Sequence, residues 1–585
     1  MNHSRKTRFP DPRSAAALAL SLLLSACATH PASSVAPATA PVAETGVTLT
    51  PVEAAKQAAI EARKQAQFQI MTGEMAAGRN QPDIAAHEFL GALDHYPDSA
   101  LASRTTSLAL AANDAELAEA AATRWLQIDP SAESAREVLA RLALRRGAVD
   151  DTLVQCQAIV AANADGPGKG LLYVARLLNQ ADNSSGVTAL QVMDKLVAQW
   201  SSLADAHQAM GILALRFGKL ELAEAAAHEA IRLDPKDPDH DFLLVGVLVR
   251  QNRLDDADHE MSQLLKNHRD KTADLRMSYA RLLLESNQRD HAHAQLETLL
   301  KENPGDSNAR YALGVMALDD QKLDRAEQLF KPLLKGKHQL DALYQMGRVE
   351  EARKNYPAAL ADYQAVTSGT SAIDAAVRSA YVLAQLGRID EAQELMQDLR
   401  AQVPQLSQRF YLTEGDLLTN VNQDTRALAV YNEALGQFPD DPDLLYGRSL
   451  VYERNNQIDQ AEQDLRTIIA GNADDARALN ALGYMLTVHT KNYDEAKKLI
   501  GRALELDPDD AAIMDSMGWV QYHLGDTTDA HKLLQAAYAK FPDPEVAAHL
   551  GEVLWAQGDK DGARAVWTQA LKKAPDQPTL RATIE

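Results

Sequence analysis

The sequence has only two cysteines, Cys27 and Cys156, among its 585 residues. Cys27 is predicted below to be the modified first residue of the mature chain, which leaves one thiol and excludes an internal disulfide framework. Cys156 falls at the apolar core position of a predicted helix, which indicates a small buried side chain rather than a nucleophile. We therefore expect a chain that is stabilised by packing alone.

Aromatic residues and positive charge are also scarce. Phe, Tyr and Trp make up 5 % of the chain, whereas hydrophobic residues as a whole reach 46 %. A composition rich in Ala and Leu favours close-packed helices over sheets. The formal net charge of −22 argues against nucleic acid as a partner, because binding to phosphates requires a basic surface. An acidic surface of this kind is either simply solvated or suited to basic partners.

Motifs for catalysis, nucleotide binding and metal binding are incomplete. The segment from Gly166 to Gly170 resembles a phosphate-binding loop, but Asn163 stands in place of its first glycine, and Gly170 in place of the Ser or Thr that binds magnesium. We predict a turn between helices there. The aspartates at 234–241 lack the glycine and the distal glutamate of a calcium loop. No catalytic residue, metal site or cofactor is therefore expected, and the chain is not expected to be an enzyme.

The N-terminus has the pattern of an export signal. Four basic residues precede the apolar run AAALALSLLL at 15–24, which is too short to span a bilayer as a permanent helix. The following Leu-Ser-Ala-Cys, at 24–27, resembles the lipobox of bacterial lipoproteins. The resemblance implies that residues 1–26 are a signal peptide and that Cys27 carries acyl chains such as palmitate. Ala28, where an aspartate would imply retention at the inner membrane, implies sorting to the bacterial outer membrane, facing the periplasm.

The residues after Cys27 predict a tether. The stretch 28–50 is rich in Ala, Pro, Thr, Val and Ser, which cannot bury much surface. We assign 27–60 to the lipidated N-terminus and an Ala/Pro-rich tether. Beyond it, no apolar run is long and charge-free enough to span a membrane, so the membrane contact is expected through the lipid alone.

The rest of the chain repeats a unit of about 34 residues. In each unit a small residue lies midway along a first helix and another opens a second helix, so that the two helices pack closely, and a proline often ends the unit. The small residue that opens the second helix recurs every 33–35 residues, at Ala223, Ala257, Ala292, Ala326, Ala359, Ala392, Ala427, Ala461, Ala496, Ala530 and Ala563.

This pattern resembles the tetratricopeptide repeat (TPR). It implies an all-α fold, a superhelical solenoid of about fifteen helix-turn-helix repeats. We expect degenerate repeats over 61–222, a regular array over 205–575 and a capping helix at 576–585, since repeat arrays need a polar cap. Glycines such as Gly218, Gly387, Gly525 and Gly558 are predicted to form the turns within units.

In the TPR family the first helices of the units line a concave groove, whose inward positions are the second, fifth, ninth, twelfth and thirteenth of each unit. Here they hold nine aromatic residues, and aromatic anchors are favoured at interfaces. The nine are Phe242, Tyr311, Tyr344, Tyr381, Tyr446, Tyr484, Trp519, Tyr522 and Trp555. The predicted partner-binding residues are Tyr446, Asn480, Tyr484, Asp515, Trp519, Tyr522, His523, Glu552 and Trp555. The alternative is that the aromatics only pack one repeat against the next.

The whole architecture resembles outer-membrane TPR lipoproteins that act as adaptors of periplasmic carboxyl-terminal-processing proteases. This resemblance implies a scaffold that recruits such a serine protease and presents cell-wall hydrolases for degradation. The alternative is a scaffold lipoprotein for an envelope export machine, as in exopolysaccharide export, pilus secretin assembly or outer-membrane protein insertion. Both readings imply protein partners.

The lipid anchor gives the first test. A Cys27→Ser variant lacks the thiol that would carry the acyl chains, so we expect it to leave the outer-membrane fraction, because the apolar contact of acyl chains is lost. Membrane fractionation followed by immunoblotting measures this. A variant that still fractionates with the outer membrane would contradict the lipid assignment.

Overall fold

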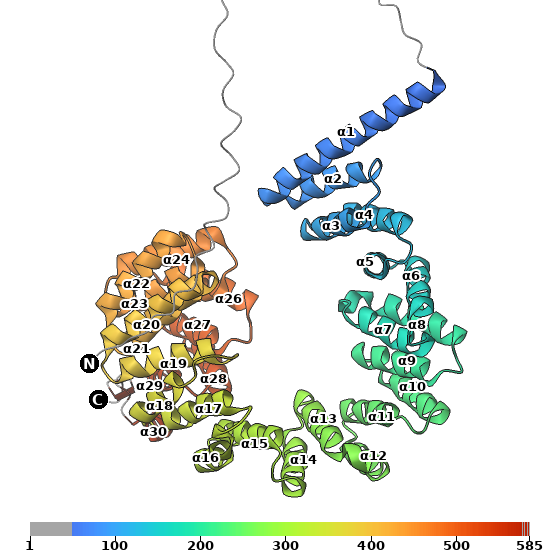
Figure 1. The fold of residues 1–585 in the computed structure, drawn as a ribbon. Helices are drawn as coiled ribbons and strands as arrows, with labels where there is room; N and C mark the ends of the chain where they lie inside the picture. The colour runs from blue at the N-terminus through green and yellow to red at the C-terminus, as the bar shows by residue number, and fades with distance from the viewer. Residues whose placement is uncertain (1–49, 576, 578–579, 582, 584–585) are drawn as a thin grey trace, which may run out of the picture. The chain divides into compact units, whose positions relative to one another are not determined.

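A computed structural model describes residues 50–575, 577, 580, 581 and 583. Over these residues the chain forms thirty α-helices and no strand (Figure 1). The predicted signal peptide, Cys27 and residues 27–49 of the predicted tether lie outside the described part. No helix in the described part is long and apolar enough to cross a membrane.

The helices belong to two compact units, one of residues 50–166 and 180–192, the other of residues 167–179 and those from 193 onward. The first contains α1 (Pro51–Gly78), α2 (Pro82–Leu93), α3 (Ser99–Ala111), α4 (Ala115–Ile128), α5 (Glu133–Arg145), α6 (Val149–Ala162) and the start of α8 (Gly186–Gln199).

The second unit contains α7 (Pro167–Asn179), α9 (Ala204–Arg216), α10 (Leu220–Leu233), α11 (Pro238–Arg250), α12 (Leu254–Asn267), α13 (Thr272–Glu285), α14 (Arg289–Glu302), α15 (Ser307–Asp319), α16 (Leu323–Phe330), α17 (Gln339–Ala352), α18 (Tyr356–Gln364), α19 (Ala372–Gln385), α20 (Ile389–Gln402), α21 (Ser407–Asn420) and α22 (Asp424–Gln437). It continues with α23 (Pro442–Arg454), α24 (Ile458–Gly471), α25 (Ala476–Met485), α26 (Tyr493–Leu506), α27 (Ala511–His523), α28 (Thr527–Lys540), α29 (Pro544–Ala556) and α30 (Lys560–Lys573).

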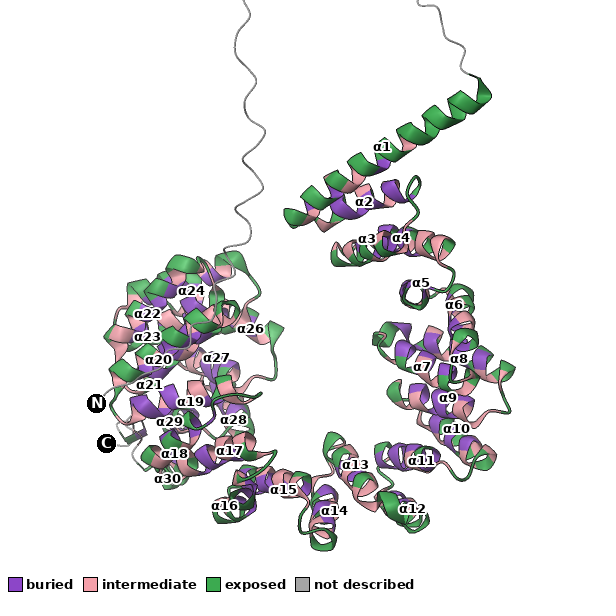
Figure 2. Ribbon diagram, viewed as in Figure 1, coloured by how far each residue is buried: buried purple, intermediate pink, exposed green. Residues whose placement is uncertain are grey.

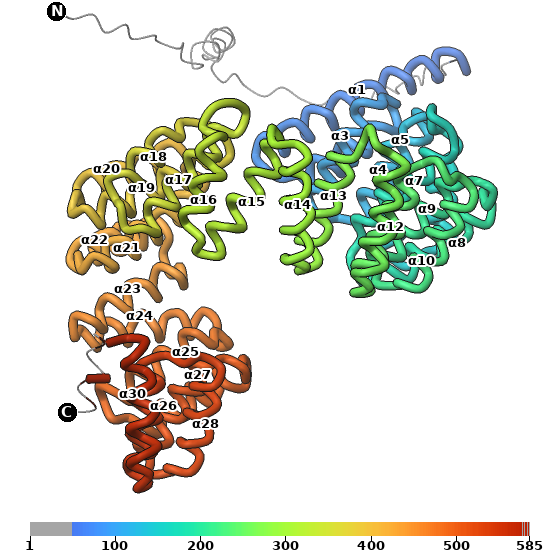
Figure 3. The backbone as a smooth tube through the Cα atoms, turned by 90° about the horizontal axis from the view of Figure 1, so that it is seen from below, coloured from blue at the N-terminus to red at the C-terminus, as the bar shows by residue number. Residues whose placement is uncertain are grey.

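The helices follow one another as pairs joined by tight turns, as the tube in Figure 3 also shows. Thirty helices in the described part correspond to the fifteen predicted units. All eleven alanines that were predicted to open second helices, from Ala223 to Ala563, are fully buried. The four predicted turn glycines have left-handed backbones, with φ between +69° at Gly218 and +92° at Gly558. The predicted all-α TPR solenoid is confirmed.

Seven of the helix pairs are held by a glycine that faces a large side chain. Glycines on first helices contact a bulky side chain of the second helix, 16 or 17 residues later. The pairs are Gly73 with Phe89, Gly314 with Phe330, Gly347 with Tyr363, Gly415 with Tyr431, Gly483 with Ile500, Gly518 with Leu534 and Gly551 with Trp567. Figure 2 shows the buried residues on the helix faces that meet in this way.

Two segments differ from their predictions. α1 begins at Pro51, inside the range 27–60 that was assigned to the tether. The Thr50 side chain accepts a hydrogen bond from the Glu53 amide, and the Glu53 carboxylate bonds the Thr50 amide in return. This capping box starts a helix within a tether-like composition. In the predicted turn at 166–170, only Gly166 has a left-handed backbone, with φ +93°, and the residues from Pro167 onward are helical.

Cys156 is a core residue, as predicted. It is fully buried on α6, and burial raises the pKa of its thiol to about 12. Of the predicted capping helix at 576–585, only four residues are described. One of them, Leu580, is fully buried in a cluster with Ala548 and Trp567.

The contact between Gly415 and Tyr431 gives the second test. A Cβ at Gly415 would lie 2.3 Å from Cζ of the buried Tyr431 ring, so Gly415→Ala should lower the free energy of unfolding by about 1–3 kcal/mol. Gly436 in α22 has no atom within 4 Å of such a Cβ, and Gly436→Ala should stabilise by up to about 1 kcal/mol. Urea unfolding followed by circular dichroism measures both. Equal shifts of the two variants would contradict the close packing.

Candidate partner-binding surfaces

A buried histidine–aspartate pair lies at the centre of the C-terminal repeats. His549 on α29 and Asp515 on α27 are 5 % and 7 % exposed. Nδ1 of His549 lies 3.0 and 3.1 Å from the two carboxylate oxygens of Asp515, so this nitrogen donates the hydrogen bond. Separating such a buried pair would leave a donor or an acceptor without its hydrogen-bond partner, which costs free energy. The pair therefore fixes α29 against α27.

Trp519 stacks directly on this pair. Its ring centroid is 4.0 Å from that of His549 at an interplanar angle of 18°, and 5.3 Å from that of Tyr522 at 26°. His523 meets it edge-on at 4.7 Å and stacks in turn on Tyr493 of α26 at 5.1 Å. The rings around Trp519 thus pack mainly against one another.

Acidic groups surround the same cluster. Tyr484 on α25 donates a hydrogen bond of 2.5 Å to Glu545 at the start of α29, and burial, together with this carboxylate, raises the pKa of Tyr484. Burial also raises the pKa of Glu552, while His549 acts to lower it. The cluster therefore combines stacked rings with carboxyl groups on the two successive first helices α27 and α29.

Six of the nine predicted partner-binding residues come together here: Tyr484, Asp515, Trp519, Tyr522, His523 and Glu552. Among the described residues, no hydrogen bond, ion pair or ring contact links the other three to this cluster. Trp555 is 39 % exposed and has Lys560, Arg564 and Trp567 within 6 Å of its ring. Tyr446 lies under the Arg477 guanidinium at 4.4 Å. Oδ1 of Asn480 is buried without a hydrogen-bond partner.

Two residues of this cluster were missed by the sequence reasoning. His549 occupies the sixth position of its unit, outside the five inward positions, whereas Glu545, in the first turn of α29, occupies the second, which is an inward position. The available signal was the spacing of 34 residues between Asp515 and His549, which is one repeat. Complementary polar residues one repeat apart would have suggested the pair.

A second surface is a hollow of about 470 Å³ on the first helices α17, α19 and α21. Tyr344 and Tyr381, two of the aromatic residues predicted at inward positions, line it. The other lining residues are Asp374, Val377, Arg378, Thr413, Asp416, Leu417 and Asn420. A neighbouring hollow of about 370 Å³ also has Arg378 in its lining. We call the two hollows together the tyrosine groove.

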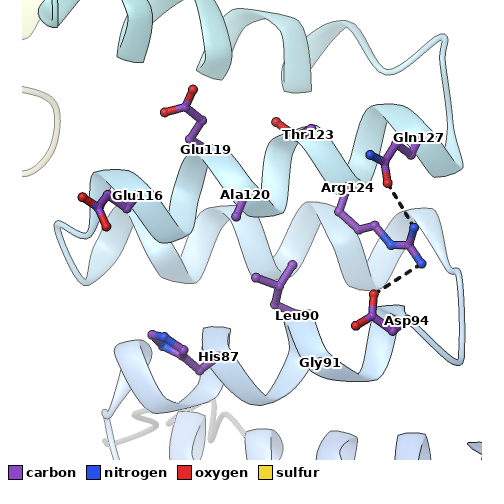
Figure 4. A pocket seen from close by; sticks show the side chains of 10 residues that line it. All are labelled: His87, Leu90, Gly91, Asp94, Glu116, Glu119, Ala120, Thr123, Arg124 and Gln127. Carbon is purple, nitrogen blue, oxygen red and sulfur yellow. Dashed lines mark hydrogen bonds and ion pairs between the residues drawn. The ribbon is translucent and has the colours of Figure 1, made fainter.

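A third hollow, of about 690 Å³, lies between the second helices α2 and α4 (Figure 4). His87 and Leu90 face Glu116 and Glu119 across it. At one end Arg124 closes on Asp94 at 3.6 Å and donates to Gln127 at 3.0 Å. The Arg124 guanidinium, which lines this hollow, thus already has partners within the protein. No group of three or more metal-binding side chains occurs in the described part of the chain.

Comparison with known proteins identifies the class. One family model of the tetratricopeptide repeat matches residues 70–133, 209–260, 277–337, 339–406, 377–442 and 516–578, which is more than half of the chain. Two further models of the same repeat match 425–483 and 476–510. The chain belongs to the tetratricopeptide repeat family. This fold is typically a non-catalytic scaffold for protein interactions, and all three matching models describe the repeat.

Among the relatives, a TPR repeat-containing protein of Pseudomonas aeruginosa is 43 % identical over 211 residues, 36 % of each chain. A TPR repeat-containing protein of Methanocaldococcus jannaschii is 20 % identical over 47 % of this chain and 53 % of its own. The chain thus spans about a third to a half of these relatives. A TPR protein of Thermus thermophilus has a solved structure that is 23 % identical, with a TM-score of 0.28, over 30 % of this chain and 95 % of its own.

The two tryptophans at predicted inward positions, Trp519 and Trp555, give the third test. Because Trp519 is stacked within the molecule, Trp519→Ala should lower the free energy of unfolding by about 3–5 kcal/mol. Trp555 is more exposed, so Trp555→Ala should cost only about 1–2 kcal/mol through its cation and ring contacts. Denaturant unfolding of each variant measures the difference. A larger loss for Trp555→Ala would contradict the assignment of Trp519 to internal packing.

Proposed function

We propose that the protein is a lipid-anchored TPR adaptor of the bacterial outer membrane, facing the periplasm. It recruits a carboxyl-terminal-processing protease and presents cell-wall hydrolases to it. The observation that carries the proposal is the order of segments: a lipobox-like sequence at 24–27, an Ala/Pro-rich stretch and then a long TPR array. Binding of protease and substrate to one chain raises their effective concentration without new contacts.

The tyrosine groove and the exposed face of Trp555 support protein partners. Aromatic rings at a surface supply large contact areas at low entropic cost. The repeat array offers such rings at Tyr344 and Tyr381, on the successive first helices α17 and α19, and at Trp555 on α29. An extended partner segment fits this arrangement better than a small molecule, because the hollows are open rather than enclosed.

An envelope export scaffold is the second candidate. Its specific support is a similarity to the cellulose synthase operon protein C of Pseudomonas fluorescens, which is 22 % identical over 446 residues, 71 % of this chain and 34 % of that protein. TPR sequences resemble one another through their shared repeat positions. A match at this identity therefore weighs less than the order of segments.

Purification of the full-length protein from envelopes gives the fourth test. We expect a carboxyl-terminal-processing serine protease and cell-wall hydrolases to copurify, as identified by mass spectrometry. With purified components at micromolar concentration, the protein should accelerate cleavage of the hydrolase about tenfold or more, because both bind one scaffold. Copurification of export-channel or pilus components instead, with no effect on cleavage, would favour the second candidate.

A further inference from the structure

Two carboxylates in the tyrosine groove form no ion pair with a cationic side chain of the described residues. Asp374 on α19 and Asp416 on α21 both line the 470 Å³ hollow and are exposed at its surface. Asp374 forms no ion pair with any described residue, and Asp416 accepts a single hydrogen bond, of 2.9 Å, from the Tyr431 hydroxyl. The surrounding protein raises the pKa of Asp416, although this hydrogen bond acts to lower it. The cause is desolvation by the neighbouring side chains, which disfavours the charged form of the carboxyl group.

The one cation in the wall of the hollow is already neutralised. Nη1 of Arg378 lies 2.9 and 3.0 Å from the two oxygens of Glu351, and the same carboxylate accepts a hydrogen bond of 2.6 Å from Tyr363. The Arg378 guanidinium also donates a hydrogen bond to the Tyr344 hydroxyl. An incoming anion would have to compete with Glu351, whereas an incoming cation finds Asp374 and Asp416 free of ion pairs.

The aromatic rings favour the same kind of ligand. Tyr344 and Tyr381 line the hollow from successive first helices and are half-buried. Tyrosine faces attract a guanidinium or ammonium group through the ring quadrupole. Rings of this kind also cover the apolar stem of a long basic side chain. The hollow thus offers carboxylates for the charged end and apolar surface for the stem, in a volume within the usual range of ligand clefts.

We propose that the tyrosine groove binds an arginine or lysine side chain carried by an extended segment of a partner protein, with Asp374 and Asp416 as the counter-charges and Tyr344 and Tyr381 as the walls. This inference rests on the proposed function as a protein-binding scaffold. It adds the chemistry of the partner, a basic segment, and its place, the first helices α17, α19 and α21.

The test uses the full-length protein and a fluorescein-labelled hexa-arginine peptide, followed by fluorescence anisotropy at physiological salt. Hexa-citrulline, its neutral isostere, should bind at least about tenfold more weakly. The double variant Asp374→Asn/Asp416→Asn should weaken binding of hexa-arginine by about tenfold or more, because two charged hydrogen bonds are lost. Tyr381→Leu should weaken it by about two- to fivefold.

A matched control separates the groove from the overall negative charge. Glu394 and Asp398 on α20 are exposed and form no ion pair with described residues. Glu394→Gln/Asp398→Asn removes the same two charges, and its affinity for hexa-arginine should change by less than about twofold, since exposed charges are screened. Equal losses in the two double variants, or no binding by the unaltered protein, would overturn the proposal. Circular dichroism checks that the variants are folded.

The failure of this inference is distinguishable from failure of the proposed function. If the protease and hydrolases copurify with the unaltered protein, but hexa-arginine binding does not depend on Asp374 and Asp416, the groove proposal is wrong and the adaptor proposal stands. If neither partner class copurifies with the unaltered protein, while hexa-arginine binding still depends on Asp374 and Asp416, the adaptor proposal is wrong and the groove proposal stands.

Discussion

The rest of the structure depends on one packing contact, a small residue of a first helix against a large side chain of the second. At Gly347 and Gly415 a ring of Tyr363 or Tyr431 occupies the space that a Cβ would fill. Interiors are packed to crystal-like density, so this contact fixes the separation and rotation of the two helices in each pair that has it. Because every hairpin still has one apolar face uncovered, the pairs must stack, and the array follows from the local contact.

The same contact sets the electrostatics of the tyrosine groove. Packing against Gly415 holds the Tyr431 ring so that its hydroxyl reaches Asp416, and packing against Gly347 holds Tyr363 so that its hydroxyl reaches Glu351. Glu351 in turn pairs with the Arg378 guanidinium. The hydroxyl groups of the core tyrosines therefore help to determine which carboxylates of the groove have hydrogen-bond partners. A substitution in the core would alter the surface through these hydroxyl groups.

Repeat spacing predicted the fold because each unit obeys the same local rule. A small residue every 33–35 positions located eleven fully buried alanines, from Ala223 to Ala563. Composition was less informative at the tether, where the capping interactions of Thr50 and Glu53 start a helix that a count of Ala and Pro residues does not show. The His549–Asp515 pair could not be assigned from inward positions, since it depends on how two neighbouring units are rotated.

The positions of aromatic residues do not by themselves distinguish packing from binding. Trp519 has an inward position, yet its ring stacks on His549 and Tyr522, whereas Tyr381, at an equivalent position, lines an open hollow. The difference comes from the neighbours: a histidine fixed by Asp515 fills the space beside Trp519, and no ring fills the hollow beside Tyr381. A net charge of −22 would attract any basic protein at long range. Selection among such proteins then requires local geometry, because exposed charges are screened within about 10 Å.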